Sequence, residues 1–472
     1  MSNIKFGTDG WRAVISDTFT FDNLKKAARA TARYFRDKEY IKISVKNKKL
    51  LLVGYDNRFH SETFAGIVAE IFAQQGFRVL WSEKSLPTPV LSHAVIARKA
   101  LGGVMITASH NPAVYNGFKV KMHYGAAAPA GETAVIESYI DTTSSETPSP
   151  VRAKITRTSF LDEYVKDVKA LVNLRCFSRL PVSLIIDPIH GSGSGLLEHI
   201  LNKTHITIQS IRNSRDPLFG GVIPEPIEKN IQELIRQVKK ADRTIGIAFD
   251  GDADRIGLID EKGNFVNSHQ IFALLIWHLI EHKGASGRII KTISGSFMAN
   301  RLAKIFGREI VETPIGFKHI TEHMLFGDVM IGGEESGGIG FKGHIPERDA
   351  LLTAMYILEM MAQTGKQLHV LIKDLNAKAC PSFYDRIDVN LQEIIDKQIF
   401  IKQVKKQIPA VFNIKPKRIQ DYDGIKCTWK DDSWILLRIS GTEPVLRIYA
   451  ESSSSKTTQK LLACGKQFQY NQ

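Results

Sequence analysis

Three aspartates at alternate positions form the pattern best suited to chemistry in this sequence. They are Asp250, Asp252 and Asp254. Directly after a predicted strand at 244–249, three carboxylates on one tight loop can converge on a hard cation. An EF-hand loop begins in the same way, and Glu261 stands at its last ligand position, but Arg255 replaces the glycine that such a loop requires. The pattern predicts a divalent-metal site that favours Mg²⁺, because three carboxylates leave coordination positions for a phosphate oxygen; a solvated acidic turn is the alternative.

A serine beside a histidine follows a second predicted strand, at 102–106. Ser109 and His110 precede Asn111-Pro112, a dipeptide typical of turns. A serine at such a break would stand at the rigid edge of a sheet, with its hydroxyl available as a nucleophile. An ordinary polar turn is the alternative for these residues.

Two glycine-bearing loops later in the chain suit a phosphorylated sugar. In the segment 332–338, glycines allow close backbone approach, and a carboxylate and a hydroxyl between them suit neighbouring sugar hydroxyls. In the segment 438–444, with Arg447 following, two arginines flank hydroxyl and amide donors, as in a phosphate-binding site. A plain glycine-rich turn and a hairpin with surface arginines are the respective alternatives.

Alternating strands and helices position these loops and divide the chain into units. Three α/β units are predicted at 1–147, 151–265 and 266–375. A polar, proline-bearing segment at 142–150 indicates a linker between the first two. Functional loops of α/β sheets lie at the carboxyl ends of strands, where the first three motifs stand. The tail at 376–472 has strand-like segments around one predicted helix, 394–406, and indicates a smaller α+β domain.

Charge and cysteine content narrow the functional classes. The formal net charge of +14 favours anionic partners, but the basic residues are spread along the chain without a zinc-finger, RNP or basic-heptad pattern, which disfavours nucleic acid. The cysteines form no CxxC pair, so reduced thiols are expected. No signal-peptide pattern opens the sequence, and the longest apolar run, 271–280, is about half of what a bilayer requires. We therefore expect a cytoplasmic protein with no membrane partner.

The four motifs, in this order and one to each predicted domain, resemble those of the α-D-phosphohexomutase superfamily, the phosphoglucomutases and phosphomannomutases. The opening segment 6–12, FGTDGWR, is also similar to the opening of the family, so the resemblance spans essentially the whole chain. It implies an α/β fold class with three related α/β domains. A fourth, C-terminal α+β domain would have a TATA-binding-protein-like fold, and the four would surround a central cleft.

The resemblance implies a phosphoserine enzyme that requires Mg²⁺. Ser109 would carry a phosphoryl group, whose oxygen completes the metal site of Asp250, Asp252 and Asp254. The phosphoryl group passes to a hexose 1-phosphate. The resulting hexose 1,6-bisphosphate, which also serves as activator, returns its other phosphate to the serine and leaves a hexose 6-phosphate.

The remaining site residues also follow from the resemblance. Around the serine, Arg255 would neutralise the phosphate, Arg12 would hold the phosphoserine end, and His110 and Lys119 are both candidates for proton transfer. Sugar contacts are expected from Lys318, Glu334 and Ser336. The distal phosphate clamp would consist of Arg438, Ser440, Gly441, Thr442 and Arg447.

The expected hexose rests on the sugar loop and a nearby segment. Glu335 resembles the glucose type of loop, whereas phosphoglucosamine mutases usually have Gln there, and the segment 316–318 also resembles phosphoglucomutases. The sequence thus predicts a phosphoglucomutase with phosphomannomutase activity, with phosphoglucosamine mutase as the alternative. An inactive sugar-phosphate-binding relative is the alternative of another class. The protein would be a monomer or a homodimer.

Overall fold

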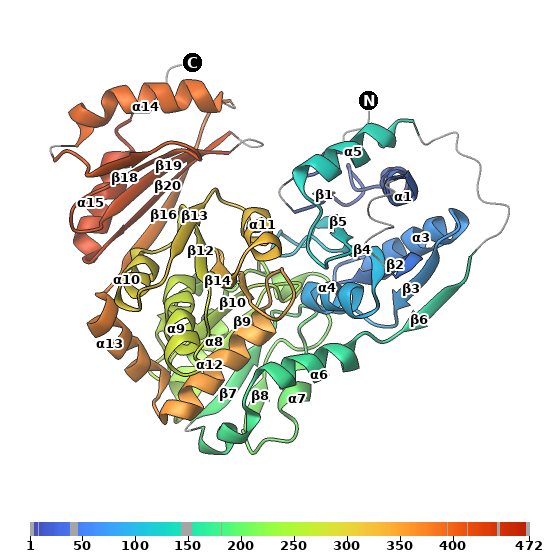
Figure 1. The fold of residues 1–472 in the computed structure, drawn as a ribbon, viewed down its shortest axis with the longest axis horizontal. Coiled ribbons are helices and arrows are strands. Elements are labelled where there is room, and N and C mark those ends of the chain that lie inside the picture. The colour runs from blue at the N-terminus through green and yellow to red at the C-terminus, as the bar shows by residue number, and fades with distance from the viewer. Residues whose placement is uncertain are drawn as a thin grey trace.

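The structure, a computed structural model, consists of four sheets with helices packed beside them (Figure 1). It describes residues 4–7, 9–37, 46–142, 153–180, 182–393, 395–412, 414–440 and 444–468. The first three sheets belong to α/β units, and the fourth is antiparallel. This arrangement confirms the predicted class of three α/β domains followed by a smaller C-terminal domain. We call the four units domains I to IV.

Domain I is built on a six-stranded sheet of order β1-β5-β4-β2-β3-β6. Its elements are β1 (Trp11–Val14), α1 (Phe21–Asp37), β2 (Asn47–Tyr55), α3 (Ser61–Gln74), β3 (Arg78–Ser82), α4 (Thr88–Ala97), β4 (Ala100–Ile106), β5 (Tyr115–Met122), α5 (Ala130–Ile140) and β6 (Ile155–Thr158). The parallel strands β2 and β4 are paired at Tyr55 and Ile106, their last residues. The loops that begin at Asp56 and Thr107 therefore leave the sheet side by side.

Domain II has a five-stranded sheet of order β11-β10-β9-β7-β8. Its helices and strands are α6 (Leu161–Leu171), β7 (Ser183–Asp187), α7 (Leu196–Leu201), β8 (Ile208–Ser210), α8 (Gln232–Lys240), β9 (Thr244–Phe249), β10 (Ile256–Ile259) and β11 (Phe265–Val266). β9 is buried throughout, and its last residue, Phe249, pairs with Ile256 in the antiparallel β10. Residues 250–255 are therefore a tight hairpin loop.

Domain III has a four-stranded sheet of order β13-β12-β14-β15. Its elements are α9 (Ser268–Glu281), β12 (Arg288–Thr292), α10 (Phe297–Ile305), β13 (Ile310–Thr313), α11 (Phe317–Phe326), β14 (Val329–Gly333), β15 (Ile339–Phe341), α12 (Ala350–Thr364) and α13 (Leu368–Ala379). Gly333 pairs with Ile339, so residues 334–338 are again a hairpin loop between antiparallel strands. Domains II and III thus present their motifs on equivalent hairpins.

Domain IV is an antiparallel sheet of order β16-β20-β19-β18-β17. Its elements are β16 (Phe383–Asn390), α14 (Lys397–Val411), β17 (Arg418–Gln420), β18 (Ile425–Thr428), β19 (Trp434–Ile439), β20 (Val445–Ser452) and α15 (Ser455–Gly465). The sequence predicted one helix here, and this was wrong, because the described residues include α15 as well as α14. The amphipathic signal of α15 is weak, since it buries only Thr458, Leu462 and Gly465.

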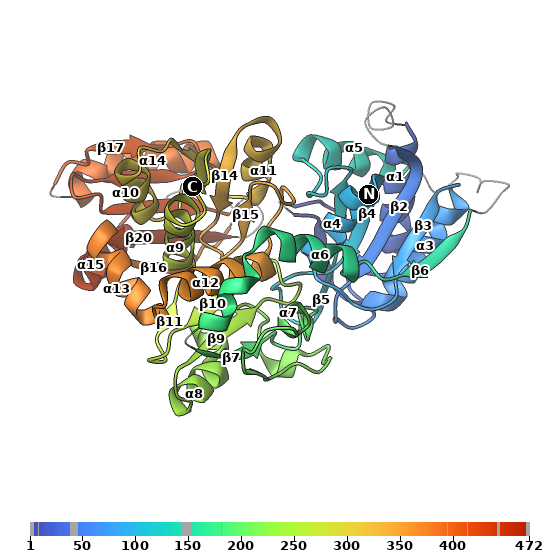
Figure 2. The ribbon, with the colours of Figure 1, turned by 60° about the horizontal axis from the view of Figure 1, so that its bottom comes forward.

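Domains I, II and III share one hydrophobic cluster, which also includes Trp434, Leu436 and Tyr449 of domain IV, and domain IV has a further cluster of its own. The shared cluster runs from Leu52 and Val90 through Ile247 to Met355. Where the domains meet, α6 of domain II packs against α4 of domain I, and Figure 2 shows α6 beside α12 of domain III. The shared core favours a fixed arrangement of the first three domains. Among the described residues, no helix is long and apolar enough to cross a bilayer.

Candidate active site

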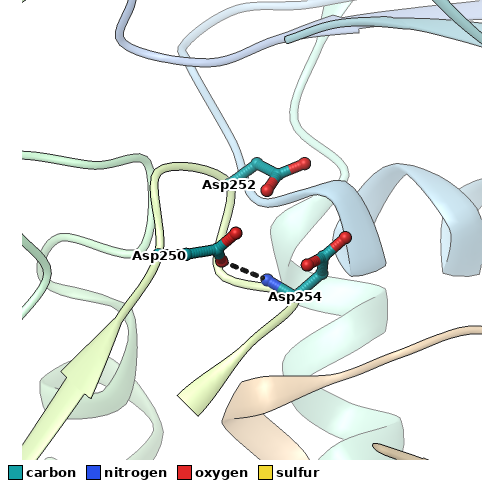
Figure 3. A group of neighbouring side chains, drawn as sticks. All are labelled: Asp250, Asp252 and Asp254. Carbon is teal, nitrogen blue, oxygen red and sulfur yellow. Dashed lines mark hydrogen bonds between the residues drawn. The ribbon is translucent and has the colours of Figure 1, made fainter. Parts of the chain in front are cut away.

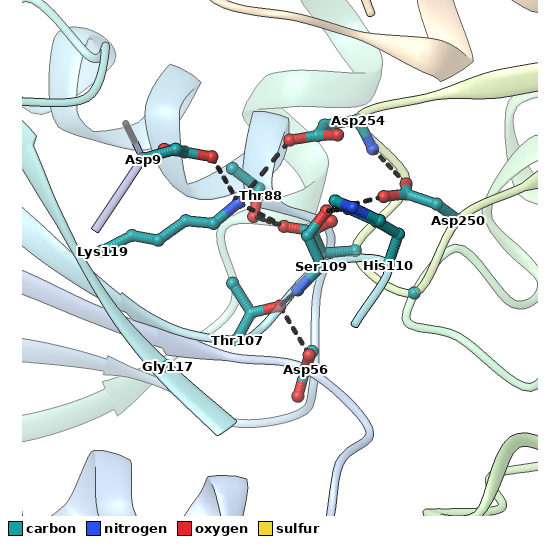
Figure 4. Close-up of polar contacts among 12 residues, drawn as sticks. Asp9, Asp56, Thr88, Thr107, Ser109, His110, Gly117, Lys119, Asp250 and Asp254 are labelled. Carbon is teal, nitrogen blue, oxygen red and sulfur yellow. Dashed lines mark hydrogen bonds and ion pairs between the residues drawn. The ribbon is translucent and has the colours of Figure 1, made fainter. Parts of the chain in front are cut away.

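The serine loop after β4 is held by hydrogen bonds to buried groups of domain I. Thr107 Oγ1 donates to Asp56 Oδ2 (2.6 Å) and accepts from the amide of Ser109 (2.9 Å). Arg58, also buried, donates to the carbonyl oxygens of Ser109 and Asn111, both at 2.6 Å. Ser109 adopts a left-handed conformation with φ of 51°, which costs energy that these contacts must offset. The loop therefore fixes the position of the Ser109 hydroxyl (Figure 4).

The serine loop meets the aspartate loop of domain II. Ser109 Oγ donates to Asp250 Oδ2 at 2.8 Å, and only 1% of Ser109 is exposed. Gly251 permits this approach, because a Cβ at that position would lie 2.5 Å from the Ser109 carbonyl oxygen. Two motifs that are 141 residues apart in sequence thus form one site.

The three aspartates of the β9–β10 loop are fully buried, and one ligand atom from each lies within 4.8 Å of the others (Figure 3). Asp250 Oδ1 accepts the backbone amide of Asp254 (3.0 Å). Among the described residues, Asp252 Oδ1 and Asp254 Oδ1 have no hydrogen-bond donor, whereas Asp254 Oδ2 is ion-paired with Arg348. Burial, followed by repulsion from Asp254 and Asp252, raises the pKa of Asp250 well above its usual range. Closely spaced, unsatisfied oxygen ligands of this kind fit Mg²⁺.

Lys119 of β5 reaches the same cluster from domain I (Figure 4). Its Nζ lies 2.9 Å from Asp252 Oδ2, 3.0 Å from Asp9 Oδ2 and 3.6 Å from Asp254 Oδ2. Burial alone would lower the pKa of Lys119, but the three carboxylates outweigh that effect and raise it. The ammonium group therefore remains protonated and can donate hydrogen bonds.

His110 lies directly beside the serine hydroxyl, with its Nδ1 3.4 Å from Ser109 Oγ. Burial, and then the charges of Arg255 and Arg12, hold the pKa of His110 well below its usual range. The imidazole is therefore neutral near pH 7 and can accept a proton.

Two predicted arginines also lie in this region. Arg12 Nη1 donates to Asn111 Oδ1 (2.8 Å) in the serine loop. Arg255 Nε lies 3.7 Å from Asp254 Oδ1, and the Arg255 side chain is 10% exposed. Both arginines are thus held beside the serine and aspartate loops, where they can bind an anionic group.

Arg348, at the start of α12, is a central residue that the sequence analysis missed. Its Nη2 lies 2.7 Å from Asp9 Oδ2 of domain I and 2.9 Å from Asp254 Oδ2 of domain II, and its Nη1 lies 3.7 Å from Glu334 Oε2 of domain III. It is 4% exposed. Arg348 therefore joins three domains through one guanidinium group. The available signal was an Arg-Asp pair just before α12, which is too common to indicate a site.

Glu334 and Ser336 lie on the β14–β15 loop, and Glu334 is connected to the centre through Arg348. Glu334 Oε1 accepts the amide of Gly316 at 3.1 Å. Burial raises the pKa of Glu334 to about 7, against the opposing charge of Arg348. Ser336 Oγ is buried and has no hydrogen-bond partner in the described chain. Lys318 is half-buried in the first turn of α11, two residues after Gly316.

Glu335, the position used to predict the hexose, is engaged within domain III. Its Oε2 accepts from Ser294 Oγ (2.6 Å) and from Thr292 Oγ1 (3.2 Å) at the end of β12. At least part of this carboxylate therefore anchors the sugar loop to the sheet. This use weakens its value as an indicator of the substrate.

The predicted phosphate clamp lies around the β19–β20 connection in domain IV. The Arg438 and Arg447 side chains are 20% and 29% exposed, and Ser440 is buried. Arg438 Nε donates to both oxygens of Asp423 at 3.1 Å, and Arg447 Nε lies 3.9 Å from Asp388 Oδ2. Gly441 and Thr442 fall outside the described residues. The two arginines come from paired positions of adjacent strands, so they project from one part of the sheet.

The fold and this site define a phosphohexomutase, and the comparisons with known families agree. Models described as "Phosphoglucomutase/phosphomannomutase, alpha/beta/alpha" domains I, II and III match residues 3–147, 162–263 and 267–379. The C-terminal domain model of the same family matches residues 405–463. The chain belongs to the phosphoglucomutase/phosphomannomutase family, as its resemblance to the α-D-phosphohexomutases predicted, and it is an isomerase of that class.

Relatives across the whole length carry different substrate names. A protein of Methanosphaera stadtmanae named as a probable phosphoglucosamine mutase is 29% identical over 469 residues, which is 99% of this chain and 98% of its own. A phosphoglucomutase/phosphomannomutase of Thermococcus kodakarensis is 28% identical over 466 residues, 98% and 97% of the two chains. The crystal structure of a Thermus thermophilus protein described as a "putative phosphomannomutase" superposes with a TM-score of 0.86, at 33% identity, covering 99% of each chain.

Proposed function

We propose that the protein interconverts hexose 1-phosphates and hexose 6-phosphates through a phosphorylated Ser109. The observation that carries this proposal is the 2.8 Å contact between Ser109 Oγ and Asp250 in a cluster of buried, partly unsatisfied carboxylates. When bound by Asp250, Asp252, Asp254 and the serine, Mg²⁺ would withdraw negative charge from the phosphoryl group. The protein residues contribute position and charge, which dominate catalysis of phosphoryl transfer.

In the forward step, the bond between Ser109 Oγ and phosphorus breaks while the free sugar hydroxyl forms a new bond to phosphorus. The proton of that hydroxyl goes to a base, and we assign this role to His110, which is neutral and lies beside Ser109 Oγ. Protonated Lys119, together with Arg12 and Arg255, stabilises charge near the leaving serine oxygen. The second step reverses these bond changes at the other end of the bisphosphate, and the proton returns to the sugar oxygen that is left free.

The distal phosphate is assigned to the clamp of domain IV. Arg438, Ser440, Gly441, Thr442 and Arg447 form this clamp. Glu334 and Ser336 would bind sugar hydroxyls. Glu334 has a buried carboxylate oxygen that faces Arg348, and Ser336 Oγ is buried and lacks a hydrogen-bond partner in the described chain. Lys318 would contribute a further cationic contact from α11. In this proposal, these groups serve both orientations of the sugar.

For the hexose, we propose glucosamine phosphate as the preferred substrate, with glucose and mannose phosphates second. This reverses the order predicted from Glu335, whose Oε2 is occupied by Ser294 and Thr292. Phosphoglucosamine mutase is the more frequent name among the curated relatives at 27% to 29% identity. Glucose and mannose remain in the proposal because of the Thermococcus and Thermus relatives.

Phosphorus NMR tests both parts of the proposal. Purified protein with Mg²⁺ and a trace of glucose 1,6-bisphosphate is given glucosamine, glucose or mannose 1-phosphate in parallel tubes. The expected result is conversion to the 6-phosphate, fastest with glucosamine 1-phosphate. Faster conversion of glucose 1-phosphate would restore the order predicted from the sequence, and no conversion in any tube by a protein with phosphorylated Ser109 would contradict the mutase assignment.

A further inference from the structure

The β17–β18 hairpin of domain IV is docked on the edge strand β13 of domain III through a buried polar contact. Glu312 of β13 accepts from Gln420 Nε2 (2.7 Å), from Lys426 Nζ (2.9 Å) and from Tyr422 OH (3.1 Å). Lys426 is 3% exposed. Three residues of one hairpin therefore converge on one carboxylate, which fixes the hairpin against the strand that leads into the β13–α11 loop.

Asp423, in the turn of the β17–β18 hairpin, connects this hairpin to the β13–α11 loop. Its Oδ2 accepts the backbone amide of Ile315 at 2.9 Å, and both of its oxygens accept from Arg438 Nε at 3.1 Å. Lys397 Nζ donates to Oδ1 at 3.1 Å. Asp423 is 5% exposed, so its carboxylate is used by these donors rather than by bulk water.

The next amide in the β13–α11 loop binds the sugar loop. Gly316 donates to Glu334 Oε1, while its neighbour Ile315 donates to Asp423. Gly316 has φ of 126°, which a residue with a side chain rarely adopts, and this conformation lets the two consecutive amides serve two separate carboxylates. Lys318 follows in the first turn of α11. One short loop thus connects the sugar-binding residues with the phosphate-binding arginine.

The bond from Asp423 also determines how Arg438 can bind phosphate. A guanidinium group has one Nε–H and two terminal NH₂ groups in a rigid plane. Because Nε is directed at Asp423, the plane of the group is fixed, and within the described part of the chain the two terminal groups remain for a bidentate contact with phosphate.

We propose that Asp423 is a positioning residue that sets the placement of Arg438 relative to the loop carrying Lys318 and contacting Glu334, so that the phosphate and the sugar are bound as one unit. This inference rests on the proposed function of the site. Asp423 itself touches neither substrate nor metal in this account. It acts through Arg438 on one side and through the amide of Ile315 on the other.

The test compares Asp423→Asn with Asp421→Asn, a matched change on the same hairpin. Asp421 pairs with Lys405 at the surface, and its side chain is 49% exposed. Asp423→Asn replaces one acceptor oxygen with a donor that faces Arg438 and Ile315. We expect KM for the hexose 1-phosphate to rise about tenfold, because roughly one charge-assisted contact is lost. The value of kcat should change less than about threefold. Asp421→Asn should leave both constants as in the wild type, and equal KM values for the two variants would overturn the proposal.

Two further measurements separate positioning from a general structural role. Asp423→Asn should also increase the fraction of hexose 1,6-bisphosphate released per turnover, because the intermediate is held less firmly at both ends. In a double-mutant cycle with Arg438→Lys, the second substitution should add less than about twofold to KM, because Asp423 acts through that arginine. Fully multiplicative effects would contradict this route.

Asp423→Glu covers the case in which the Asn variant does not fold. It retains the charge and both acceptor oxygens but lengthens the side chain by one methylene. We expect a smaller rise in KM, about threefold, and increased bisphosphate release. An Asp423→Glu enzyme with wild-type KM and release would overturn the proposal.

Amide hydrogen exchange distinguishes failure of this inference from failure of the proposed function. In Asp423→Asn the amide of Ile315 should exchange faster than in the wild type and in Asp421→Asn, whether or not the enzyme turns over any hexose phosphate. An inactive wild type with this exchange difference would refute the proposed function only. An active wild type without it would refute the role of Asp423.

Discussion

The proposed catalytic centre and the proposed phosphate clamp hold their charged groups in different ways. At the centre, Ser109 is 1% exposed and Lys119 and Asp252 are fully buried, and each contacts a residue of another domain. In the clamp, the side chains of Arg438 and Arg447 are 20% and 29% exposed. The centre therefore surrounds its charges with fixed partners, whereas the clamp leaves long cationic side chains partly in solvent.

The difference in solvent exposure between the centre and the clamp agrees with the role proposed for each region. Phosphoryl transfer gains from charges that are fixed before the reaction, since they need no reorganisation in the transition state. In the proposed reaction, the clamp instead accepts the phosphate of either end of a bisphosphate, and these two ends differ in their surroundings on the sugar. We therefore expect substitutions at the centre to lower kcat and substitutions in the clamp to raise KM.

Ser109→Ala should have the largest effect, because it removes the group that carries the phosphoryl moiety. We expect kcat to fall by at least about 10,000-fold, with the fold preserved since the change removes one hydroxyl. Phosphorus NMR measures the turnover, and Ser138→Ala, at the exposed hydroxyl of α5, is the control. Near-normal turnover by Ser109→Ala would remove the serine from the mechanism.

Asp252→Asn should have the second-largest effect on activity. The substitution weakens the set of metal ligands and also the contacts to Lys119 and Thr88. We expect kcat to fall about 100-fold and the Mg²⁺ concentration for half-maximal activity to rise at least about tenfold. Activity measured against Mg²⁺ concentration checks this. A variant, or a wild-type enzyme, that works equally well in excess chelator would contradict the metal site.

Arg447→Ala tests the proposed phosphate clamp. Loss of a charge-assisted contact to phosphate costs about 1.5–3 kcal/mol, which corresponds to a rise in KM of about 10- to 150-fold. We expect kcat to stay within about threefold, because the contact is made equally in the ground state and the transition state. Steady-state kinetics check this, with the exposed Arg418→Ala as control. A drop in kcat at constant KM would place Arg447 with the centre instead of the clamp.

Whether a residue could be found from the sequence depends on whether its partners lie in the same segment of the chain or in distant ones. The serine, aspartate and sugar loops are continuous segments at strand ends or hairpins, so local patterns indicate them, and the alternation of strands and helices indicates the three α/β domains. Arg348 and Arg58 are single residues whose partners come from distant segments. Arg348, for example, contacts Asp9, which is 339 residues away. No local pattern encodes such a contact, and the fold must be known first.

The pH dependence of sugar binding should show the smallest effect, and it concerns Glu334, which lies between the two regions. Burial raises its pKa to about 7. The ionised carboxylate accepts hydrogen bonds from sugar hydroxyls better than the neutral acid does, so KM should rise about fivefold as the pH falls from about 8 to about 6. In Glu334→Gln, KM should no longer show the pH dependence that Glu334 causes. It should still show the pH dependence that comes from titration of the substrate phosphate. Identical pH profiles for the two proteins would show that Glu334 does not titrate in this range.

The same carboxyl group gives the opposite dependence for stability. Because the folded-state pKa of Glu334 lies above its ordinary value of 4.5, the folded protein binds this proton more tightly than the unfolded chain does. The resulting stabilisation is complete below about pH 4.5 and is lost as the pH rises through about 7. Urea unfolding at several pH values should therefore show a decline over this range in the wild type that Glu334→Gln lacks. The pH range that favours substrate binding by Glu334 is thus the range in which its burial stabilises the fold least, as expected for a buried carboxylate kept for binding.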